Sequence, residues 1–354
     1  MRTNKVLLIY TGGTIGMGRN PKTGALEPLD FNHLINALPE FEQIETAVDV
    51  SAFNAPIDSS NVSPAEWRQM VEIISTNYDS YDGFVILHGT DTMAYTASAL
   101  SFMLENLTKP VILTGSQLPM GQLRTDGKEN LITSLELASY YHTITTSDGR
   151  QMEVARVPEV AIYFNGKLLR GNRSTKCSAD EFYAFNSFNY PHLCDAGVDF
   201  EFHDHHILQP NLSLPMTPHT EMDTRVMVFS LFPGIQKDMV KHMLSYPNLR
   251  GIIMRTFGSG NAPQQQWLLD ILSEATSRGI IIVNISQCES GTVEMGRYDT
   301  GYFLQQAGVI SGYDSTVEAV STKLMHLLAI HHDNDTIRQL MNTSLAGEIT
   351  LPEA

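Results

Sequence analysis

Three short segments rich in threonine, serine and glycine stand directly after apolar runs of the sequence. They cover residues 11–16, 88–92 and 114–117. A threonine hydroxyl becomes a useful nucleophile when a base lies within hydrogen-bond reach, and glycine lets the backbone approach a ligand closely. A tight turn would explain the glycines alone. The recurrence of Thr14, Thr90 and Asp91 after apolar runs therefore predicts a ligand site with hydroxyl chemistry.

The apolar runs that precede these segments have the length and composition of buried strands. They cover residues 6–10, 83–87 and 110–113, and a further run covers 160–164. Helical patterns stand between them at about 93–106 and 126–140, the second with Asp126 as its expected N-cap. Strands that alternate with helices predict a parallel sheet. Because ligands bind beyond the carboxyl ends of such strands, we expect the three segments to meet there.

The second half of the chain repeats this alternation after an interruption. Residues 203–224 contain three prolines and few apolar pairs, which predicts a linker. Strands are expected again at 225–229, 251–254 and 279–283, and helices at 236–244, 262–278 and 315–332. We therefore predict an α/β protein with two open, mostly parallel sheets of the Rossmann or flavodoxin type. The larger N-terminal domain covers residues 1–202, the linker 203–224 and the smaller C-terminal domain 225–354.

Composition narrows the function further. The 39 acidic and 23 basic residues give a net charge of −16, which argues against a nucleic-acid partner because such partners need clustered lysine and arginine. The cysteines Cys177, Cys194 and Cys288 form no CxxC pair, so a disulfide framework or a zinc site is not expected. The sequence has no run approaching the ~20 apolar residues of a membrane span and no secretory signal pattern, so we expect a cytoplasmic protein.

Two other motifs are weaker. The first glycine loop lacks the third glycine of GxGxxG and the Gly-Lys-Ser/Thr ending of a phosphate loop, so neither nucleotide interpretation is favoured. The histidines His203, His205 and His206 suggest a metal, yet no cysteine or carboxylate scaffold stands beside them, and we expect solvated loop histidines and no metal site. His88 is expected to be a structural turn residue.

The two longest motifs resemble a known family. Residues 10–17 (YTGGTIGM) and 88–93 (HGTDTM) are similar to the two signatures of the L-asparaginase family, the bacterial-type amidohydrolases with a threonine nucleophile. The similarity continues through residues 94–102, 115–119, 124–127, 171–176, 258–263 and 316–319, over nearly the whole chain. It is greatest to the cytosolic type I branch.

This resemblance implies an asparaginase/glutaminase-like fold and the hydrolysis of a linear amide, L-asparagine, to L-aspartate and ammonia through an acyl-enzyme. Thr14 matches the family's nucleophile, and Thr90, Asp91 and Lys176 match its second triad. A lysine beside these two residues can poise a proton relay. Backbone N–H groups near Gly13 and Thr90 are candidates for an oxyanion hole.

The resemblance also implies how a zwitterionic substrate is held. Asp91 suits the α-ammonium group, Ser59 and Ser60 in the turn that begins at Asp58 match the carboxylate-binding turn, and Ser116 matches the position facing the scissile amide. From the residues alone, two simpler interpretations stay open. The two serines of the turn can be capping residues before Pro64. Lys176 can be a solvated surface lysine.

One departure from the family concerns the residue that activates the nucleophile. The family usually carries a tyrosine in the flexible loop after the nucleophile, and residues 18–28 contain none. Tyr298, in a second segment that resembles the family, is our hypothesis for this role. The resemblance further suggests asparagine-dependent regulation through Thr175, Arg255, Asn261 and Cys288. Asn261 can alternatively complete the active site of a neighbouring subunit.

The resemblance implies a homotetramer, a dimer of dimers, that needs no metal or organic cofactor. Two alternatives stay open. The first is the asparaginase-like subunit of an archaeal tRNA-dependent amidotransferase, against which count the acidic charge and a first strand that begins at about Val6. The second is a non-catalytic amino-acid sensor, which has no need of Thr14 with Lys176. The ratio of asparaginase to glutaminase activity does not follow from sequence, because one methylene changes discrimination by only ~1–3 kcal/mol.

Overall fold

The first strand forms because an uninterrupted apolar run can be buried on both faces of a parallel sheet. In the computed structural model, which describes residues 3–19, 26–28, 43–146, 148–296 and 299–351, strand β1 (Lys5–Gly12) is buried from Val6 onward. The chain divides into two units, Met1–Thr220 and Glu221–Ala354, each with its own sheet. The predicted α/β fold class is confirmed by this architecture.

The first unit is built on an eight-stranded sheet with the order β15-β14-β11-β10-β7-β5-β1-β4. The five strands from β10 to β4 pair in parallel, and the other three pair antiparallel. The strands after β1 are β4 (Ala47–Ile57), β5 (Gly83–Leu87), β7 (Val111–Thr114), β10 (Val160–Phe164), β11 (Lys167–Arg170), β14 (Cys194–Ala196) and β15 (Phe200–Phe202).

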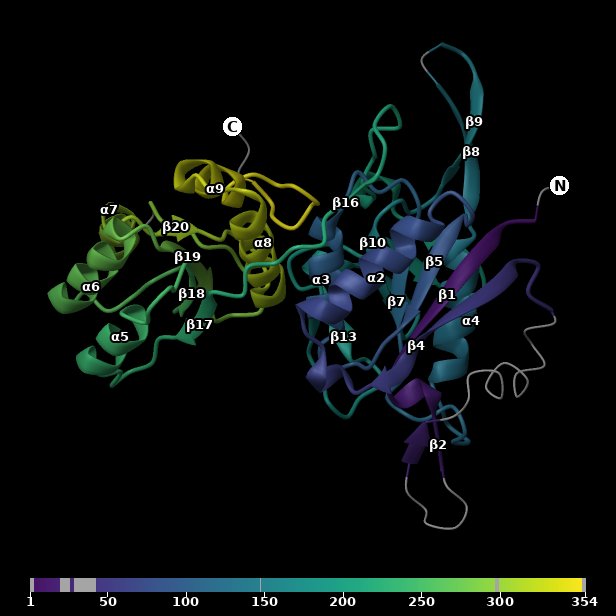
Figure 1. Cartoon of the computed structure of the whole chain (residues 1–354), viewed down its shortest axis with the longest axis horizontal. Helices are drawn as coiled ribbons and strands as arrows, with labels where there is room; N and C mark the ends of the chain where they lie inside the picture. The colour runs from purple at the N-terminus through teal and green to yellow at the C-terminus, as the bar shows by residue number, and fades with distance from the viewer. Residues whose placement is uncertain (1–2, 20–25, 29–42, 147, 297–298, 352–354) are drawn as a thin grey trace. The chain divides into compact units, whose positions relative to one another are not determined.

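Helices cover both faces of this sheet, as parallel strands require. Figure 1 shows α2 (Pro64–Asn77) and α3 (Met93–Met103) on one side and α4 (Gly127–Ala138) on the other. Leu131 and Leu135 of α4 share one core cluster with Val6, Leu8 and Val85. Alternate residues of the same strands face the opposite helices.

The starts of two helices correct local expectations. Helix α2 is capped by Ser63, whose side chain and that of Glu66 form a capping box, so the interpretation of Ser59 and Ser60 as its caps is wrong. Asp126 does occupy the N-cap position of α4, but its side chain makes no capping bond. Its carboxylate instead accepts hydrogen bonds from the backbone of Gln117 and Leu118, which ties the turn after β7 to α4.

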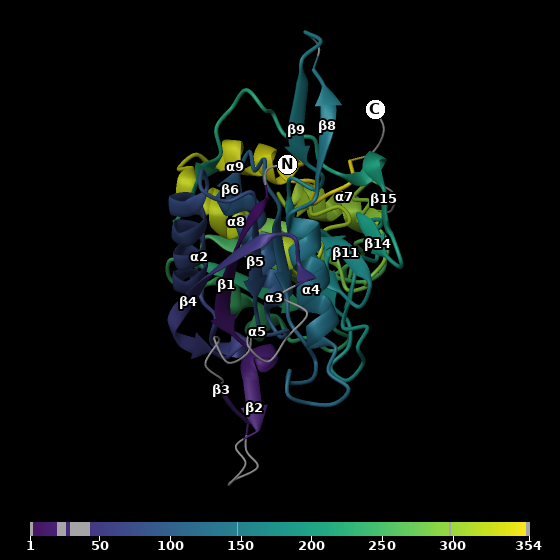
Figure 2. The ribbon, with the colours of Figure 1, turned by 90° about the vertical axis from the view of Figure 1, so that its right-hand side faces the viewer.

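The first unit also contains several two-stranded antiparallel sheets. The hairpin of β8 (Tyr141–Thr145) and β9 (Gln151–Ala155) projects from the sheet (Figures 1 and 2). The other pairs are β2 (Met17–Arg19) with β3 (Leu26–Pro28), β12 (Thr175–Lys176) with β13 (Phe185–Asn186), and β6 (Leu104–Glu105) with β16 (Thr217–Pro218). The last pair shows that part of the expected linker, residues 203–224, is built into the first unit.

Of the histidines in that segment, His205 is exposed, as expected, but His203 is not simply solvated. The carboxylate of Asp195 lies 2.8 Å from Nε2 of His203 and 3.3 Å from Nδ1 of His192, and it also accepts a hydrogen bond from Lys167. Burial alone would raise the pKa of Asp195, but these hydrogen bonds lower it to about 2. A carboxylate therefore does stand beside His203. Among the described residues, no group of three or more histidine, cysteine or acidic side chains is arranged to hold a metal.

The second unit is a smaller parallel sheet with the order β17-β18-β19-β20. Its strands are β17 (Val226–Ser230), β18 (Gly251–Thr256), β19 (Ile281–Ser286) and β20 (Ile310–Ser311), and its helices are α5 (Lys237–Leu244), α6 (Gln266–Ser277), α7 (Asp299–Gln306), α8 (Val317–Ile330) and α9 (Asn334–Met341). Ile252 and Met254 pack in one cluster with α5, α6 and α7, whereas Ile253 packs with α8 and α9 on the opposite face. In the part of the chain that the structure describes, no helix is long and apolar enough to cross a membrane.

Candidate active site

The three hydroxyl-rich segments meet at one edge of the first sheet. Strands β1, β5 and β7 are neighbours, and Leu87 of β5 pairs with Tyr10 of β1 and with Thr114 of β7. The segments that follow these strands therefore leave the sheet side by side, as expected from the parallel order.

Glycine allows these segments to touch. Gly13 has a φ of +87°, and a Cβ built on it would lie 2.6 Å from the backbone nitrogen of Gly89. A Cβ on Gly89 would in turn lie 2.5 Å from Oγ of Ser59. Since no side chain fits at either position, the loop that carries Thr14 lies directly against the loop that carries Thr90, which lies against the turn of Ser59.

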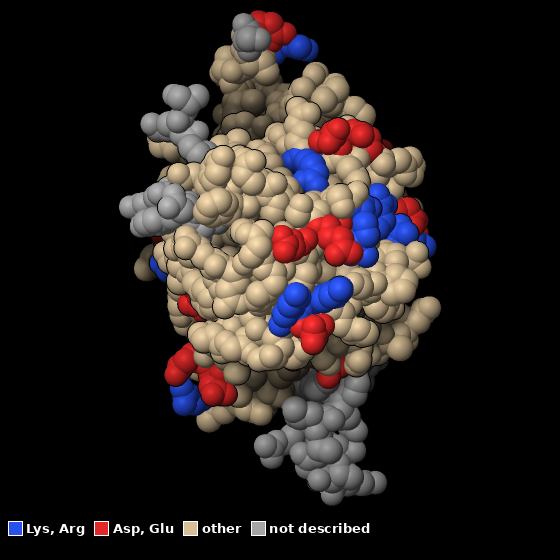
Figure 3. All heavy atoms as spheres, turned by 90° about the vertical axis from the view of Figure 1, so that its left-hand side faces the viewer, with Lys and Arg blue, Asp and Glu red and all other residues tan. Residues whose placement is uncertain are grey.

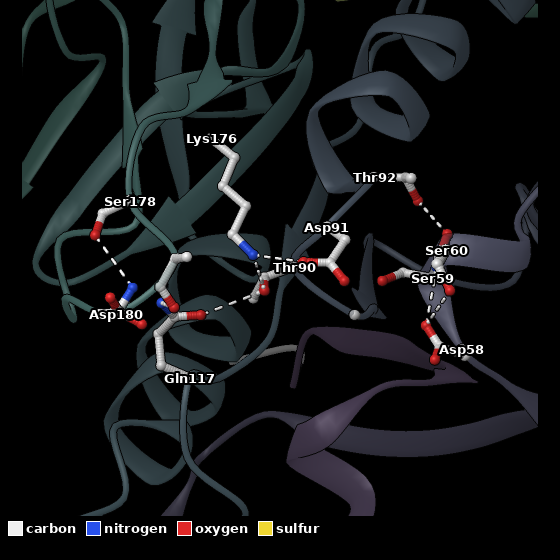
Figure 4. A network of polar contacts seen from close by, with 12 residues as sticks. Asp58, Ser59, Ser60, Thr90, Asp91, Thr92, Gln117, Lys176, Ser178 and Asp180 are labelled. Atoms are coloured by element: carbon white, nitrogen blue, oxygen red, sulfur yellow. Dashed lines mark hydrogen bonds and ion pairs between the residues drawn. The ribbon is translucent and has the colours of Figure 1, made fainter.

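Lys176 reaches into this edge from a distant part of the chain. Its Nζ donates hydrogen bonds to Oγ1 of Thr90 at 2.9 Å and to Oδ1 of Asp91 at 2.6 Å (Figure 4). The Lys176 side chain is 19% exposed and that of Asp91 is 63% exposed. The interpretation of Lys176 as a solvated surface lysine is therefore wrong, while the carboxylate of Asp91 stays open to solvent.

A buried ion pair supports the segment that carries Lys176. Strand β12 follows β11 through the short helix η4 (Gly171–Arg173), and Arg170 at the end of β11 pairs with Glu159 at 2.6 Å with both side chains almost fully buried. The Arg170 guanidinium also lies 4.4 Å from the ring centroid of Tyr190. On its other side, Lys176 pairs in register with Phe185 of β13. Lys176 is thus presented from a fixed backbone.

The turn at residues 58–61 is organised by Asp58. Its Oδ1 accepts hydrogen bonds from the backbone nitrogen and from Oγ of Ser60, both at 2.9 Å. These bonds lower the pKa of Asp58, the backbone bond contributing most. Thr92 donates from Oγ1 to the carbonyl oxygen of Ser59 at 2.6 Å. The turn is therefore tied to the start of α3, next to Thr90.

Two neighbours in the third segment have different surroundings. The Ser116 side chain is buried, and its Oγ has no hydrogen-bond partner among the described residues. Gln117 accepts a hydrogen bond from Oγ1 of Thr90 at 3.3 Å. A buried hydroxyl without a partner costs free energy, so Ser116 is suited to a polar group of a bound ligand.

His88 stabilises the edge from beneath. It is buried, with Nδ1 2.6 Å from the carbonyl oxygen of Gly89 and Nε2 3.0 Å from Oγ1 of Thr96. Because a carbonyl only accepts, Nδ1 carries the proton and Nε2 accepts from Thr96. Burial lowers the pKa of His88 to about 4, so the ring is neutral at pH 7. These contacts give it a structural role beneath the site.

Some predicted residues lie outside this cluster or outside the description. Tyr298 and residues 20–25 of the loop after Thr14 are outside the described residues. Thr14 begins a short helix, η1 (Thr14–Gly16), and is half-buried. In the described part of the chain its hydroxyl has no hydrogen-bond partner. The identity of a group that would activate Thr14 stays a prediction.

The expected regulatory residues fall into different units. Arg255 is the penultimate residue of β18, Cys288 follows the neighbouring strand β19, and Asn261 pairs its backbone with Phe257 just after β18. These three lie at the carboxyl edge of the second sheet, where Nε of Arg255 is buried without a partner among the described residues. Thr175 belongs to the first unit, beside Lys176.

Sequence reasoning missed two residues of the network, Gln117 and Thr92. Gln117 lies inside a motif that resembles the family, but nothing in the sequence shows that its amide faces Thr90. Thr92 follows Asp91 directly, and its bond to the turn of Ser59 depends on how β4 returns beside β1. Only the threonine-rich character of residues 88–92 pointed to it.

Comparison with known proteins gives the family. Residues 5–208 match the family model "Asparaginase, N-terminal", and residues 225–341 match "Glutaminase/Asparaginase C-terminal domain". The chain belongs to the asparaginase family. The resemblance predicted from the two signature motifs is confirmed.

Individual relatives agree with this assignment. The chain is 44% identical over 364 residues to L-asparaginase 1 of Escherichia coli (strain K12), with 99% of each chain covered. The crystal structure of L-asparaginase I from Vibrio cholerae superposes with a TM-score of 0.88 at 41% identity, covering 99% of this chain and 100% of that one. The chain is also 34% identical to a glutamyl-tRNA(Gln) amidotransferase component of Sulfolobus acidocaldarius, over 98% of this chain and 76% of the relative.

Proposed function

We propose that this protein is an L-asparaginase that hydrolyses L-asparagine to L-aspartate and ammonia. The observation that carries the proposal is the bonding of Lys176 to both Thr90 and Asp91 at the sheet edge beside the Thr14 loop. A lysine that bonds a hydroxyl and an exposed carboxylate can move a proton and still leave the carboxylate available to a substrate. The family assignment and the full-length similarity to an enzyme named L-asparaginase 1 support it.

The proposed chemistry uses a threonine nucleophile. Oγ of Thr14 attacks the side-chain amide carbon of asparagine, its proton is taken up by the site, and the C–N bond breaks as ammonia leaves with a proton. A water molecule then attacks the resulting ester and releases aspartate and the free hydroxyl. Thr90 and Lys176 are proposed as the proton relay, and Tyr298 as the activating group. Backbone N–H groups near Gly13 and Thr90 would stabilise the oxyanion. These steps need no metal or organic cofactor.

The substrate would be held through complementary charges. Lys176 occupies Oδ1 of Asp91, which leaves Oδ2 for the α-ammonium group. Ser59 and Ser60 would bind the α-carboxylate of the substrate. Asp58 would act indirectly, by holding the turn through its hydrogen bonds from Ser60. Direct contact between the Asp58 carboxylate and the substrate carboxylate would be repulsive. Ser116 would bond the scissile amide, which gives its buried hydroxyl a partner.

Further parts of the proposal rest on the family. We propose a cytoplasmic homotetramer, a dimer of dimers, in which Thr175, Arg255, Asn261 and Cys288 take part in regulation by asparagine. Nε of Arg255, buried at the sheet edge with no partner in the described part of the chain, supports an anionic ligand there. Asn261 has the alternative role of completing a neighbouring subunit's site. Of the expected linker 203–224, we propose only the part that follows β16 as the link between the domains.

A component of a tRNA-dependent amidotransferase is the second candidate, favoured by the 34% identity to the relative from Sulfolobus acidocaldarius. The net charge of −16 counts against it, because RNA binding draws on clustered basic side chains. On the face of the molecule drawn in Figure 3, acidic and basic side chains are interspersed. Asparagine hydrolysis in the absence of tRNA would separate the two functions.

The experiment is ammonia release from L-asparagine and L-glutamine by the full chain and by Thr14→Ala. We expect release from asparagine and a loss on the order of 10³-fold or more in Thr14→Ala. Thr145→Ala, at an exposed threonine of β8, is the matched control and should match the parent. Acid-quenched protein should carry an aspartyl ester on Thr14. A folded wild-type protein that binds asparagine but releases no ammonia would instead be a sensor.

A further inference from the structure

Gln117 joins Thr90 to a second part of the chain. Its Oε1 accepts from Oγ1 of Thr90, and its Nε2 donates to the carbonyl oxygens of Ala179 at 3.1 Å and Glu181 at 3.0 Å. Figure 4 shows the side chain between Thr90 and the segment that carries Asp180. Because both carbonyls only accept hydrogen bonds, the amide nitrogen must face them. The amide oxygen is therefore directed to Thr90.

The backbone of Gln117 is also fixed. Its nitrogen donates to both carboxylate oxygens of Asp126, at 3.1 and 3.0 Å, and the adjacent Leu118 nitrogen donates to the same carboxylate at 3.1 Å. Asn130 donates from Nδ2 to the carbonyl oxygen of Gly115 at 3.0 Å. Two residues of the α4 region thus hold the turn, and the carbonyls of Ala179 and Glu181 hold the amide.

This geometry sets the direction of the Thr90 hydroxyl. A threonine hydroxyl has one proton, and here that proton points to Gln117. Toward Lys176 the oxygen therefore presents a lone pair, which accepts from Nζ. The three groups form a chain of hydrogen bonds from Lys176 through Thr90 to Gln117, in which each bond strengthens the next.

We propose that Gln117 is a positioning residue for amide hydrolysis: it orients the Thr90 hydroxyl and docks the segment after Lys176 against the relay. The proposal rests on the proposed function. Gln117 touches neither of the groups that would bind the substrate's charges, so it acts through Thr90. Its loss should therefore lower kcat and leave KM nearly unchanged.

Two substitutions separate orientation from simple packing. Gln117→Met keeps the length of the side chain and removes the acceptor, so the Thr90 proton is free to point to Lys176. Gln117→Glu keeps an acceptor for Thr90 but loses the donor to the carbonyl oxygens of Ala179 and Glu181. It also places a negative charge near the lysine, which favours its ammonium form. We expect kcat for asparagine to fall roughly tenfold in each. The acid limb of kcat/KM against pH should move to lower pH in Gln117→Met and to higher pH in Gln117→Glu.

Gln122→Met is the matched control, because Gln122 bonds Pro119 and Thr125 through its backbone, and its side chain makes no hydrogen bond with any described residue. It should retain the parent kcat and pH profile. Folding of every variant is checked by circular dichroism and thermal unfolding. The proposal would be overturned if both variants fold and the acid limb of kcat/KM against pH stays in place, or moves in the same direction in both. Absence of ammonia release by the wild-type chain would contradict the proposed function instead.

Discussion

The two units of the chain each contain a short lysine–carboxylate pair, and the pairs differ in their surroundings. Lys176 and Asp91 lie 2.6 Å apart with 19% and 63% of their side chains exposed, whereas Lys323 and Glu348 lie 2.5 Å apart with 1% and 0% exposed. The first pair is open at one end. The second pair is closed to solvent. A lysine–carboxylate pair can therefore serve a ligand site in one unit and the stability of the fold in the other.

Both side chains of the closed pair also make hydrogen bonds with the surrounding backbone. Lys323 in α8 also donates to the carbonyl oxygens of Met341 and Thr343, and Glu348 accepts from the nitrogens of Leu345 and Ala346. Burial lowers the pKa of Lys323, and the adjacent carboxylate opposes that effect. Nothing of this pair is left for a ligand. It ties the end of the chain to α8.

The open pair predicts the largest effect, on activity. Lys176→Met removes the proposed proton relay and should lower kcat for asparagine by roughly 10²–10⁴-fold. Because Asp91 is largely exposed, the free energy of unfolding should change by less than about 1 kcal/mol. Steady-state kinetics and chemical denaturation measure the two quantities. Lys241→Met, at an exposed position of α5, is the control for the substitution itself.

A Lys176→Met protein that is active but unstable would reverse the comparison. It would show that the pair at the sheet edge is structural, and the proton relay would then have to be sought elsewhere.

The closed pair predicts the converse, a loss of stability. Lys323→Met leaves the carboxylate of Glu348 buried without its counter-ion, which should cost about 3–5 kcal/mol in the unfolding of the second unit. Differential scanning calorimetry should show the lower transition. Adding Glu348→Gln removes the charge and keeps an acceptor for the backbone, so the double variant should recover part of the loss. If Lys323→Met alone unfolded at the wild-type temperature, a structural role for the Lys323–Glu348 pair would be contradicted.

The sequence was sufficient for the fold class because strands such as β5 and β10 are continuous apolar runs. Parallel order then brings residues 11–16, 88–92 and 114–117 to one edge. Local hydrogen bonding was not predictable. Asp126 stands at a helix start in the sequence, yet its carboxylate bonds the turn of Gln117. Such bonds depend on elements that pack only in the folded chain.

The surroundings of Lys176 and Lys323 could not be predicted from the sequence either. Lys176 is 86 residues from Thr90, on a two-residue strand that no periodicity announces, so only the resemblance to the family pointed to it. Lys323 sits in a helix where lysine is ordinarily exposed, and it is buried because the segment from Met341 to Glu348 closes over it.

The smallest of these three effects concerns His88, which lies next to Gly89 and close to the open pair, and it appears only in acid. His88 is buried and neutral, with its pKa lowered by burial from 6.5 to about 4. Above pH 6.5 neither the folded nor the unfolded state binds this proton. As pH falls from 6.5 to about 4 the unfolded state binds it first, so stability is lost progressively, by roughly 3 kcal/mol in total.

The difference in unfolding free energy between wild type and His88→Gln isolates this contribution. Wild type should be the more stable protein at pH 7, because Gln does not reproduce both ring hydrogen bonds. The difference in unfolding free energy between the two proteins should then decrease as the pH falls from 6.5 to 4. His205→Gln, at an exposed histidine of the same unit, is the control for the substitution itself. Asp195, whose pKa is lowered to about 2, does not confound the result, because both proteins carry it and its contribution cancels in the difference. A difference in unfolding free energy that stays constant over this pH range would show that the His88 ring is not buried in solution. The hydrogen bond from His88 to Gly89 could then not be what holds the backbone next to Thr90.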